Sequence, residues 1–237
     1  MKQNCIWRWC RVGVWALLAL SLFGMTARAQ TKPAGGLLVC IGDSITAGEP
    51  RQIVGEGNDY VSLLRKQAKA AGENLRVQGQ GRSGWTTGDY ARNVDAMVRE
   101  MPAEATIVTI MLGTNDTRMD AAPQEIAEQA VANLRKLVAG YAKKAPAARF
   151  VILSAPALYP DLLDQPMKDA NYTEDGPAEV AALRDAYKAM AEEDGHAFVD
   201  VSDLPSHDKS VEGVHPDAAG HAELADRIWQ ALQDAKQ

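Results

Sequence analysis

Short apolar runs alternate with longer segments of helical spacing along most of the chain after residue 36. Short apolar runs that end at glycine or polar residues are typical of buried strands, whereas apolar residues that recur every three or four positions are typical of amphipathic helices. The runs predict strands over residues 37–41, 75–78, 106–112, 150–153 and 197–201. The helical spacing predicts helices over residues 60–71, 87–99, 123–144, 178–194 and 217–235.

Strands and helices that alternate in this way form parallel βαβ units, in which helices cover both faces of the sheet. The run at 106–112 fits a central strand, because it is apolar apart from its threonines. We therefore expect an α/β fold, a three-layer α/β/α sandwich around a five-stranded parallel sheet. Ligands of such sheets bind at the carboxyl ends of the strands. Polar residues that directly follow strands are therefore the candidates for a functional site.

Three short motifs follow predicted strands. GDSIT (residues 42–46) comes directly after the first strand and places Ser44 on a tight turn. SGWTT follows the second strand and offers the main-chain amide of Gly84. GTND follows the third strand and offers the side-chain amide of Asn115. A serine hydroxyl becomes a good nucleophile only when a neighbouring base takes its proton, and each motif alone is also ordinary turn or helix-capping chemistry.

The candidate base is His215, in the motif EGVHP (residues 212–216) directly before the last predicted helix. The chain has four histidines, and an exposed loop position is the ordinary interpretation of any one of them. His215 differs because Glu212 lies three residues earlier. A turn can bring that carboxylate to one ring nitrogen while the other nitrogen faces a serine.

Together, GDS, SG, GTND and acid-x-x-His-Pro stand in the order of the four signature blocks of the SGNH (GDSL) hydrolase family, which the chain resembles from residue 37 to its end. The runs MLGTNDTR and SGWTT are similar to the arylesterase-like branch. The resemblance implies a flavodoxin-like fold and a serine esterase that hydrolyses, or transfers, short acyl groups through an acyl-enzyme, without a metal or other cofactor. It implies that Ser44 is the nucleophile and His215 the base, with an oxyanion hole formed by Ser44, Gly84 and Asn115.

One position departs from the family pattern. The family usually has aspartate three residues before the histidine, whereas this chain has Glu212. Glutamate replaces aspartate in some serine triads, so we take Glu212 as the third catalytic residue. The alternatives are Asp208 or Asp203 in its place, or a catalytic dyad without an acid.

Other functions fit parts of the sequence. A carbohydrate O-acetylesterase would use the same catalytic residues. Trp85 is a candidate to line an acyl or sugar pocket, and a helix-packing role fits it equally well. The polar segments 49–58 and 157–177 are candidates for the rim of the site, where they would set the preference for the leaving group. A metal-dependent hydrolase would draw on polar residues near the end of the chain, namely His207, Asp208, His215, Asp217 and His221. Their spacing matches no standard ligand pattern. A periplasmic ligand-binding module would keep the pocket without needing the serine.

The first 29 residues have the pattern of a secretory signal peptide. Lys2, Arg8 and Arg11 precede an uncharged, mostly apolar run of 14 residues (12–25), and Ala27-Arg28-Ala29 has small residues at the two positions that signal peptidase reads. The run is shorter than the roughly 20 residues that cross a bilayer, which favours a cleaved signal peptide. A retained membrane anchor is the alternative interpretation. We expect a periplasmic or secreted protein with a signal peptide over 1–29, a flexible lead-in over 30–36 and one SGNH hydrolase domain over 37–237.

Charge and cysteine content narrow the partners. Cleavage after Ala29 would remove four of the 25 basic residues and none of the 31 acidic ones, which leaves a formal charge of −10. Nucleic acids and anionic membrane surfaces bind clusters of Lys and Arg, so we expect neither as a partner and take a small-molecule ester as the substrate. Cys5 and Cys10 would leave with the signal peptide. Cys40 would then remain alone in a buried strand as a structural thiol, without a disulfide.

Overall fold

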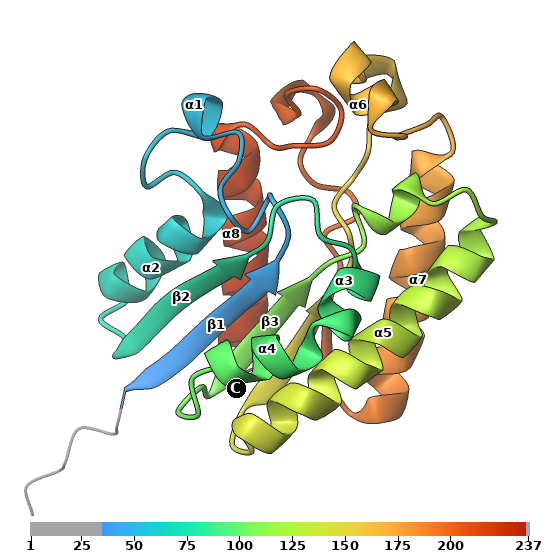
Figure 1. Ribbon diagram of the computed structural model, residues 1–237. Coiled ribbons are helices and arrows are strands. Elements are labelled where there is room, and N and C mark those ends of the chain that lie inside the picture. Colours follow the sequence, from blue (N-terminus) through green and yellow to red (C-terminus); the bar gives the residue numbers. More distant parts are fainter. Residues whose placement is uncertain (1–34, 236–237) are drawn as a thin grey trace, which may run out of the picture. The chain divides into compact units, whose positions relative to one another are not determined.

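Five parallel strands form one sheet in the spatial order β2-β1-β3-β4-β5. They span Gly36–Gly42 (β1), Leu75–Gly81 (β2), Ile107–Met111 (β3), Arg149–Leu153 (β4) and Ala197–Val199 (β5). All neighbouring strands pair in parallel, and Figure 1 shows the sheet in the computed structural model. The expected α/β fold with a five-stranded parallel sheet is confirmed, and its strand order is the flavodoxin-like one.

The structure describes residues 35–235. The expected signal peptide (1–29) and residues 30–34 of the expected lead-in lie outside the described residues. Gly36 of that lead-in is the first residue of β1. Within the described range, none of the helices combines the length and the apolar character that crossing a bilayer requires.

Each face of the sheet has its own layer of helices. Leu37, Val39 and Ile41 of β1 point to one face, and Leu38 and Cys40 point to the other. The first face packs against α3 (Thr87–Arg92), α4 (Val94–Glu100), α5 (Pro123–Lys144) and α7 (Gly176–Asp194). The second face packs against α2 (Tyr60–Ala70) and α8 (Ala218–Asp234), as Figure 1 shows. This arrangement is the expected three-layer α/β/α sandwich.

The predicted helix over 87–99 is wrong in one respect, because the segment forms two helices, α3 and α4. Asn93 lies between them with φ of −104° and donates through Nδ2 to the carbonyl of Asp89 at 2.9 Å. The main-chain amide of Asn93 donates to the same carbonyl at 3.1 Å, so the side chain is an additional donor at the end of α3. Asparagine, whose side chain readily bonds to the nearby main chain, is typical of a helix end rather than a helix interior.

Strand β2 runs beyond the predicted end at Gln78 and finishes at Gly81. Gly79 and Gly81 lack the apolar side chains by which a buried strand shows in a sequence, so the pattern stops too early. The additional residues extend β2 to the same level as Gly42, the last residue of β1.

Short helices occur in the connections, where the sequence predicts none. They are α1 (Arg51–Val54), α6 (Gln165–Asp169) and the 3-10 helices η1 (Asp116–Arg118), η2 (Pro160–Leu162) and η3 (His207–Lys209). Each follows the carboxyl end of a strand, and each is too short for a helical period to show in the sequence. They build the edge of the sheet at which a ligand is expected.

Candidate active site

Ser44 lies on a tight turn directly after β1. The amide of Glu49 donates to the carbonyl of Ser44 at 3.0 Å, and the side chain of Asp43 accepts from the amide of Ile45 at 3.0 Å. Gly42 precedes the turn, and a Cβ there would collide with the turn itself. The close approach of chain segments therefore requires glycine before the serine. Ser44 remains 8% exposed at the surface of this edge.

A hydrogen-bonded chain joins three of the residues that the sequence predicts for the site. Oγ of Ser44 lies 2.8 Å from Nε2 of His215. Nδ1 of His215 is hydrogen-bonded to Oε1 of Glu212. The serine comes from the first turn of the domain and the histidine from a loop 171 residues later. The fold thus brings two residues that are far apart in the sequence to one edge of the sheet.

Two opposing effects act on the pKa of His215. Burial lowers it, whereas the Glu212 carboxylate raises it through its hydrogen bond and its charge. The charges of Asp43 and Glu49 add to the upward effect, and the pKa lies above the ordinary value of 6.5. His215 is therefore a stronger proton acceptor toward Ser44 than an exposed histidine.

Gly84 and Asn115 follow the two strands that flank the strand of Ser44, because β1 lies between β2 and β3. The amide of Trp85 donates to the carbonyl of Arg82 at 3.1 Å, which closes a turn with Gly84 as its third residue. Gly84 has φ of 75°, as a type II turn requires at that position. Nδ2 of Asn115 donates to the carbonyl of Trp85 at 3.0 Å, so the second and third motifs contact each other.

The buried carboxyl group of Asp116 also links the second and third motifs. Asp116 accepts from the amide of Thr87 at 3.0 Å and from its hydroxyl. Burial raises the pKa of Asp116 to about 6, and burial does the same to Asp43 beside Ser44. Two buried carboxyl groups thus lie next to the candidate nucleophile and the candidate amide donors.

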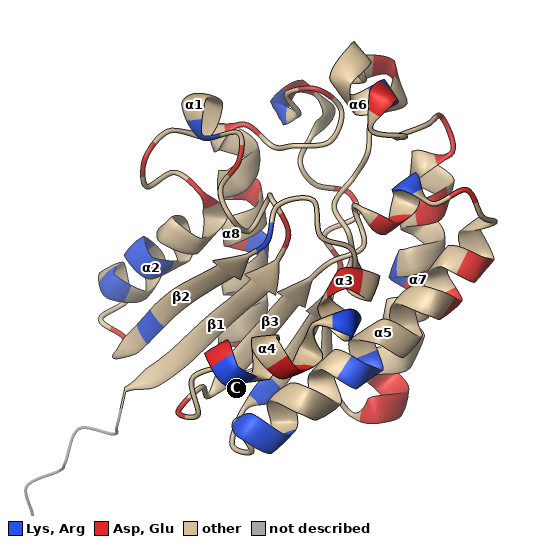
Figure 2. Cartoon of the chain, in the orientation of Figure 1, with Lys and Arg blue, Asp and Glu red and all other residues tan. Residues whose placement is uncertain are grey.

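A cavity of about 500 Å³ opens beside His215. Its polar lining includes Glu49, Arg51, Gln52, Asp164 and Glu212. These residues come from the α1 region, from the start of α6 and from the histidine loop, and Figure 2 shows charged residues in the loops around this end of the molecule. His215 and Glu212 line the cavity, whereas Ser44, Gly84 and Asn115 do not, so it lies on the histidine side of the hydrogen-bonded chain.

Trp85, the candidate for substrate binding, is placed differently. Its ring packs edge-on against Tyr90 with 5.1 Å between ring centroids, and the Arg82 guanidinium lies 5.9 Å from its centroid. It is partly buried against the core and does not line the cavity beside His215. The structure therefore supports the packing interpretation of this residue.

The residues of the metal-hydrolase alternative do not converge. His207 bonds to Asp161 through Nε2 at 2.8 Å, and Asp217 caps α8 by accepting from the amide of Gly220. His221 is buried and accepts through Nδ1 from the amide of Tyr60 at 3.3 Å. Within residues 35–235, no three His, Cys, Asp or Glu side chains are grouped as metal ligands.

Two residues that the sequence does not single out also contact the site. Tyr172 hydrogen-bonds to the side chain of Asn115, and Arg118 hydrogen-bonds to the carbonyl of Gly84. Tyr172 lies within the polar segment 157–177, but no motif or spacing distinguishes it from its neighbours there. Arg118 is the last residue of the run MLGTNDTR, which by itself gives this residue no role.

Comparison with known proteins gives the same family as the motifs. The GDSL-like Lipase/Acylhydrolase family model matches residues 40–223, which is more than half of the chain. A curated relative, the GDSL lipase Rv0518 of Mycobacterium tuberculosis, is 28% identical over 198 residues, which cover 79% of this chain and 78% of the relative.

Solved structures share the fold. Est24, a carbohydrate acetylesterase from Sinorhizobium meliloti, aligns with a TM-score of 0.66 at 22% identity over 84% of this chain and 99% of its own. The native aryl esterase of M. smegmatis aligns with a TM-score of 0.66 at 24% identity over the same shares. At these identities the likeness shows the fold, and the family model carries the assignment. The chain belongs to the GDSL-like lipase/acylhydrolase (SGNH) family of ester hydrolases.

Proposed function

We propose that the chain is a serine carboxylic-ester hydrolase that removes short acyl groups from small ester substrates and passes them to water or to another alcohol. The observation that carries the proposal is the hydrogen-bonded chain from Ser44 through His215 to Glu212. Membership of the ester-hydrolase family supports it. A nucleophile, a base and an orienting acid in contact are the arrangement that activates a serine.

The reaction has two acyl-transfer steps. Nε2 of His215 takes the proton of Ser44 as Oγ attacks the ester carbonyl and forms a C–O bond. The tetrahedral intermediate then collapses, the bond to the leaving alcohol breaks, and His215 gives its proton to that alcohol. Water, or a second alcohol, attacks the acyl-enzyme with the same histidine as base, and Ser44 is released with its proton restored.

Negative charge develops on the ester carbonyl oxygen as the tetrahedral intermediate forms, and hydrogen-bond donors at this edge of the sheet must stabilise it. The proposed donors are the amides of Ser44 and Gly84 and the side-chain amide of Asn115. Glycine presents an unhindered amide at residue 84, and the structure leaves open space where a Cβ would project. Donors that are already oriented before the reaction stabilise the transition state without reorganisation.

Covalent labelling of the serine tests the proposal. The wild type should react with a fluorophosphonate probe and hydrolyse p-nitrophenyl acetate, whereas Ser44→Ala should do neither, with kcat lower by a factor on the order of 10⁵–10⁶. Ser62→Ala, on the outer helix α2, is the matched control and should keep both. A folded wild type that is not labelled would instead favour a non-catalytic ligand-binding module.

The cavity favours a second candidate within the same chemistry, a carbohydrate O-acetylesterase. His215 protonates the leaving alcohol, so the cavity on its side is the position for that alcohol. Charged and amide side chains line it together with Pro50, Met167 and Val211, so the cavity offers hydrogen-bond partners to a leaving group that carries several hydroxyls. Acetylated sugars should then give higher kcat/KM than p-nitrophenyl acetate, and an equal or lower value would favour the aryl-ester alternative.

We further propose that the protein is exported to the periplasm or secreted, on the sequence of residues 1–29. Fractionation of cells that express the full chain should recover a protein shortened at Ala29 outside the cytoplasm. Recovery of the full-length chain in the membrane fraction would support the retained anchor instead.

A further inference from the structure

The connection between α6 and α7 reaches across to the motif turns. Asn171, with φ of 72°, donates through Nδ2 to the carbonyl of Arg118. The next residue, Tyr172, donates from its hydroxyl to Oδ1 of Asn115 at 3.0 Å. The amide of Tyr172 donates in turn to the carbonyl of Met167 in α6 at 3.1 Å. Residues 171 and 172 are therefore bonded both to α6 and to the turn that follows β3.

The Trp85 carbonyl determines which way the Asn115 amide faces, and the Tyr172 hydroxyl holds the oxygen on the other side of that amide. One N–H of Asn115 Nδ2 donates to the carbonyl of Trp85. A flipped amide would set Oδ1 against that carbonyl, two acceptors with no hydrogen between them. With Oδ1 held by Tyr172, the second N–H of Nδ2 is kept as a donor for the substrate. A hydrogen bond to Oδ1 also polarises the amide and strengthens that donor.

Tyr172 is suited to this contact through its surroundings. The side chain is buried, with 7% of the residue exposed, and its hydrogen bond to Asn115 is buried as well. Burial raises the pKa of the phenol above its ordinary value, so the hydroxyl stays protonated and remains a donor at any pH at which the enzyme works.

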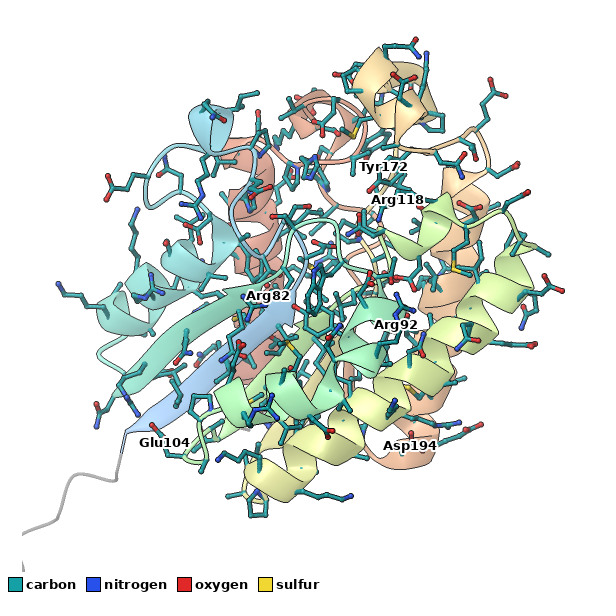
Figure 3. All side chains as sticks on the ribbon, viewed as in Figure 1. Arg82, Arg92, Glu104, Arg118, Tyr172 and Asp194 are labelled. Atoms are coloured by element: carbon teal, nitrogen blue, oxygen red, sulfur yellow. The ribbon has the colours of Figure 1, made fainter. Side chains whose placement is uncertain are left out.

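Arg118 contacts both motif turns at once. Nη2 donates to the carbonyl of Gly84 at 2.8 Å, and Nε donates to the carbonyl of Asn115 at 3.1 Å. The guanidinium also lies 5.8 Å from the centroid of the Tyr172 ring, and Figure 3 shows the two labelled side chains next to each other. The planar guanidinium spans two acceptors in a fixed geometry, which an ammonium group does not reproduce.

We propose that Tyr172 and Arg118 are positioning residues that hold the Asn115 side chain and the Gly84 main chain in the orientation that the oxyanion hole requires. The inference rests on the proposed function, because it concerns the donors of that reaction. Neither residue touches the reacting atoms. Both act through the donors, so their loss should lower kcat and leave KM and the pH profile of His215 almost unchanged.

Tyr172→Phe is the first test, since it removes one hydroxyl and keeps the ring. It leaves Oδ1 of Asn115 buried without its donor, and kcat for p-nitrophenyl acetate should fall about tenfold with KM within twofold. Tyr141→Phe is the matched control, because the Tyr141 hydroxyl in α5 is also buried but has no hydrogen-bond partner among the described residues. It should leave kcat unchanged, and circular dichroism should show that both variants are folded.

A double-mutant cycle separates positioning from a merely structural role. If Tyr172 acts through Asn115, Tyr172→Phe should cost nothing further in a chain that already carries Asn115→Ala. Asn115→Ala alone should lower kcat by about 10²–10³-fold. If Tyr172→Phe instead lowers kcat by a further tenfold in the Asn115→Ala chain, the proposal for Tyr172 is overturned.

Arg118 is tested by the pair Arg118→Lys and Arg118→Gln. Lysine keeps the charge but not the two-pronged contact, so both variants should lose kcat by a similar factor of about 5–20. Full activity of Arg118→Lys would overturn the role of the guanidinium. If the wild type is labelled at Ser44 and hydrolyses esters, and the substitutions at Tyr172 and Arg118 leave kcat unchanged, this inference is overturned and the proposed function stands. A wild type that does neither removes the proposed function as well.

Discussion

Glu212 is one methylene longer than the aspartate usual in this family, and the loop around it accommodates that length. The amide of Val211 donates to the carbonyl of His215 at 2.8 Å, and Ser210 pairs with Pro216 in an isolated bridge. The loop is therefore closed on itself, and the Glu212 and His215 side chains meet inside it. Their side chains are 12% and 15% exposed, so solvent screens this pair less than a surface pair.

Replacing Glu212 with glutamine should lower kcat and shift the acid limb of the pH profile to lower pH. The carboxylate raises the pKa of His215 against the effect of burial, and without it burial is left to lower that pKa. Only neutral His215 accepts the serine proton, so wild-type activity is lost as the pH falls through the raised pKa. In the variant the loss comes at lower pH, and kcat is lower by about 10²–10⁴-fold.

The pH dependence of kcat/KM checks this expectation. Asp203→Asn and Asp208→Asn are the controls, because these are the other acids that the sequence offers. Asp203 pairs with Arg227 at 3.0 Å, so its removal should leave the profile as it is. An acid limb that moves in either control, or stays in place in Glu212→Gln, would contradict the assignment of Glu212.

Among individual residues, the sequence identifies those that lie in a recognisable motif at the end of a strand or the start of a helix. Ser44, Asn115 and His215 are of this kind. Tyr172 is not, because its partner Asn115 lies 57 residues earlier and the contact depends on how one connection folds over another. Trp85 shows the converse, since a tryptophan beside a motif indicates binding and packing equally well, and only the contacts with Tyr90 and Arg82 distinguish them.

The carboxyl end of β2 lies against the turn that carries Ser44. A Cβ on Gly81 would lie 2.7 Å from the carbonyl oxygen of Asp43 and closer still to the amide of Ala47. These are main-chain atoms of the nucleophile turn, so they cannot move aside as a flexible side chain can. The distance between β2 and the turn is therefore set by the absence of a side chain at residue 81.

Gly81→Ala should displace the nucleophile turn, lowering kcat and reducing the free energy of unfolding by about 1–3 kcal/mol. Gly79→Ala is the matched control in the same strand, because the atoms nearest to a Cβ there belong to the side chain of Val61, the first of them at 3.3 Å. It should change both quantities far less. Urea unfolding and p-nitrophenyl acetate kinetics measure them, and equal effects of the two substitutions would contradict the role of the close approach at Gly81.

Long elements are predictable from their periodicity, and short ones are not. The predicted ranges for α2, α5, α7 and α8 agree with the structure to within two residues at each end. The break between α3 and α4 lies at Asn93, a polar residue that leaves no trace in the apolar pattern. The short helices α1 and α6 have no period to detect, and they carry part of the cavity lining.

At the scale of the whole domain, stability comes from two apolar layers that share one sheet. Alternate residues of β1 contribute to both layers, and β1 is an interior strand between β2 and β3. Exposing β1 therefore separates both layers at once, and we expect the domain to unfold as one unit. Cys40 is the free, buried cysteine of this strand and offers a direct probe of that unit.

The labelling rate of Cys40 should report the free energy of global unfolding. The thiol is fully buried, and burial raises its pKa to about 12, so a thiol reagent should react only with opened molecules.

In the full chain with Cys5→Ser and Cys10→Ser, Cys40 is the single thiol. The ratio of its labelling rate to the rate in concentrated urea gives the equilibrium constant for opening, and −RT times the logarithm of that constant gives the free energy of opening. That value should equal the free energy of unfolding from urea titration, and a reducing agent should not change the melting temperature. A much smaller opening free energy would mean that β1 leaves the sheet without the rest of the domain, so that the edge carrying Ser44 would be less firmly held than the two layers imply.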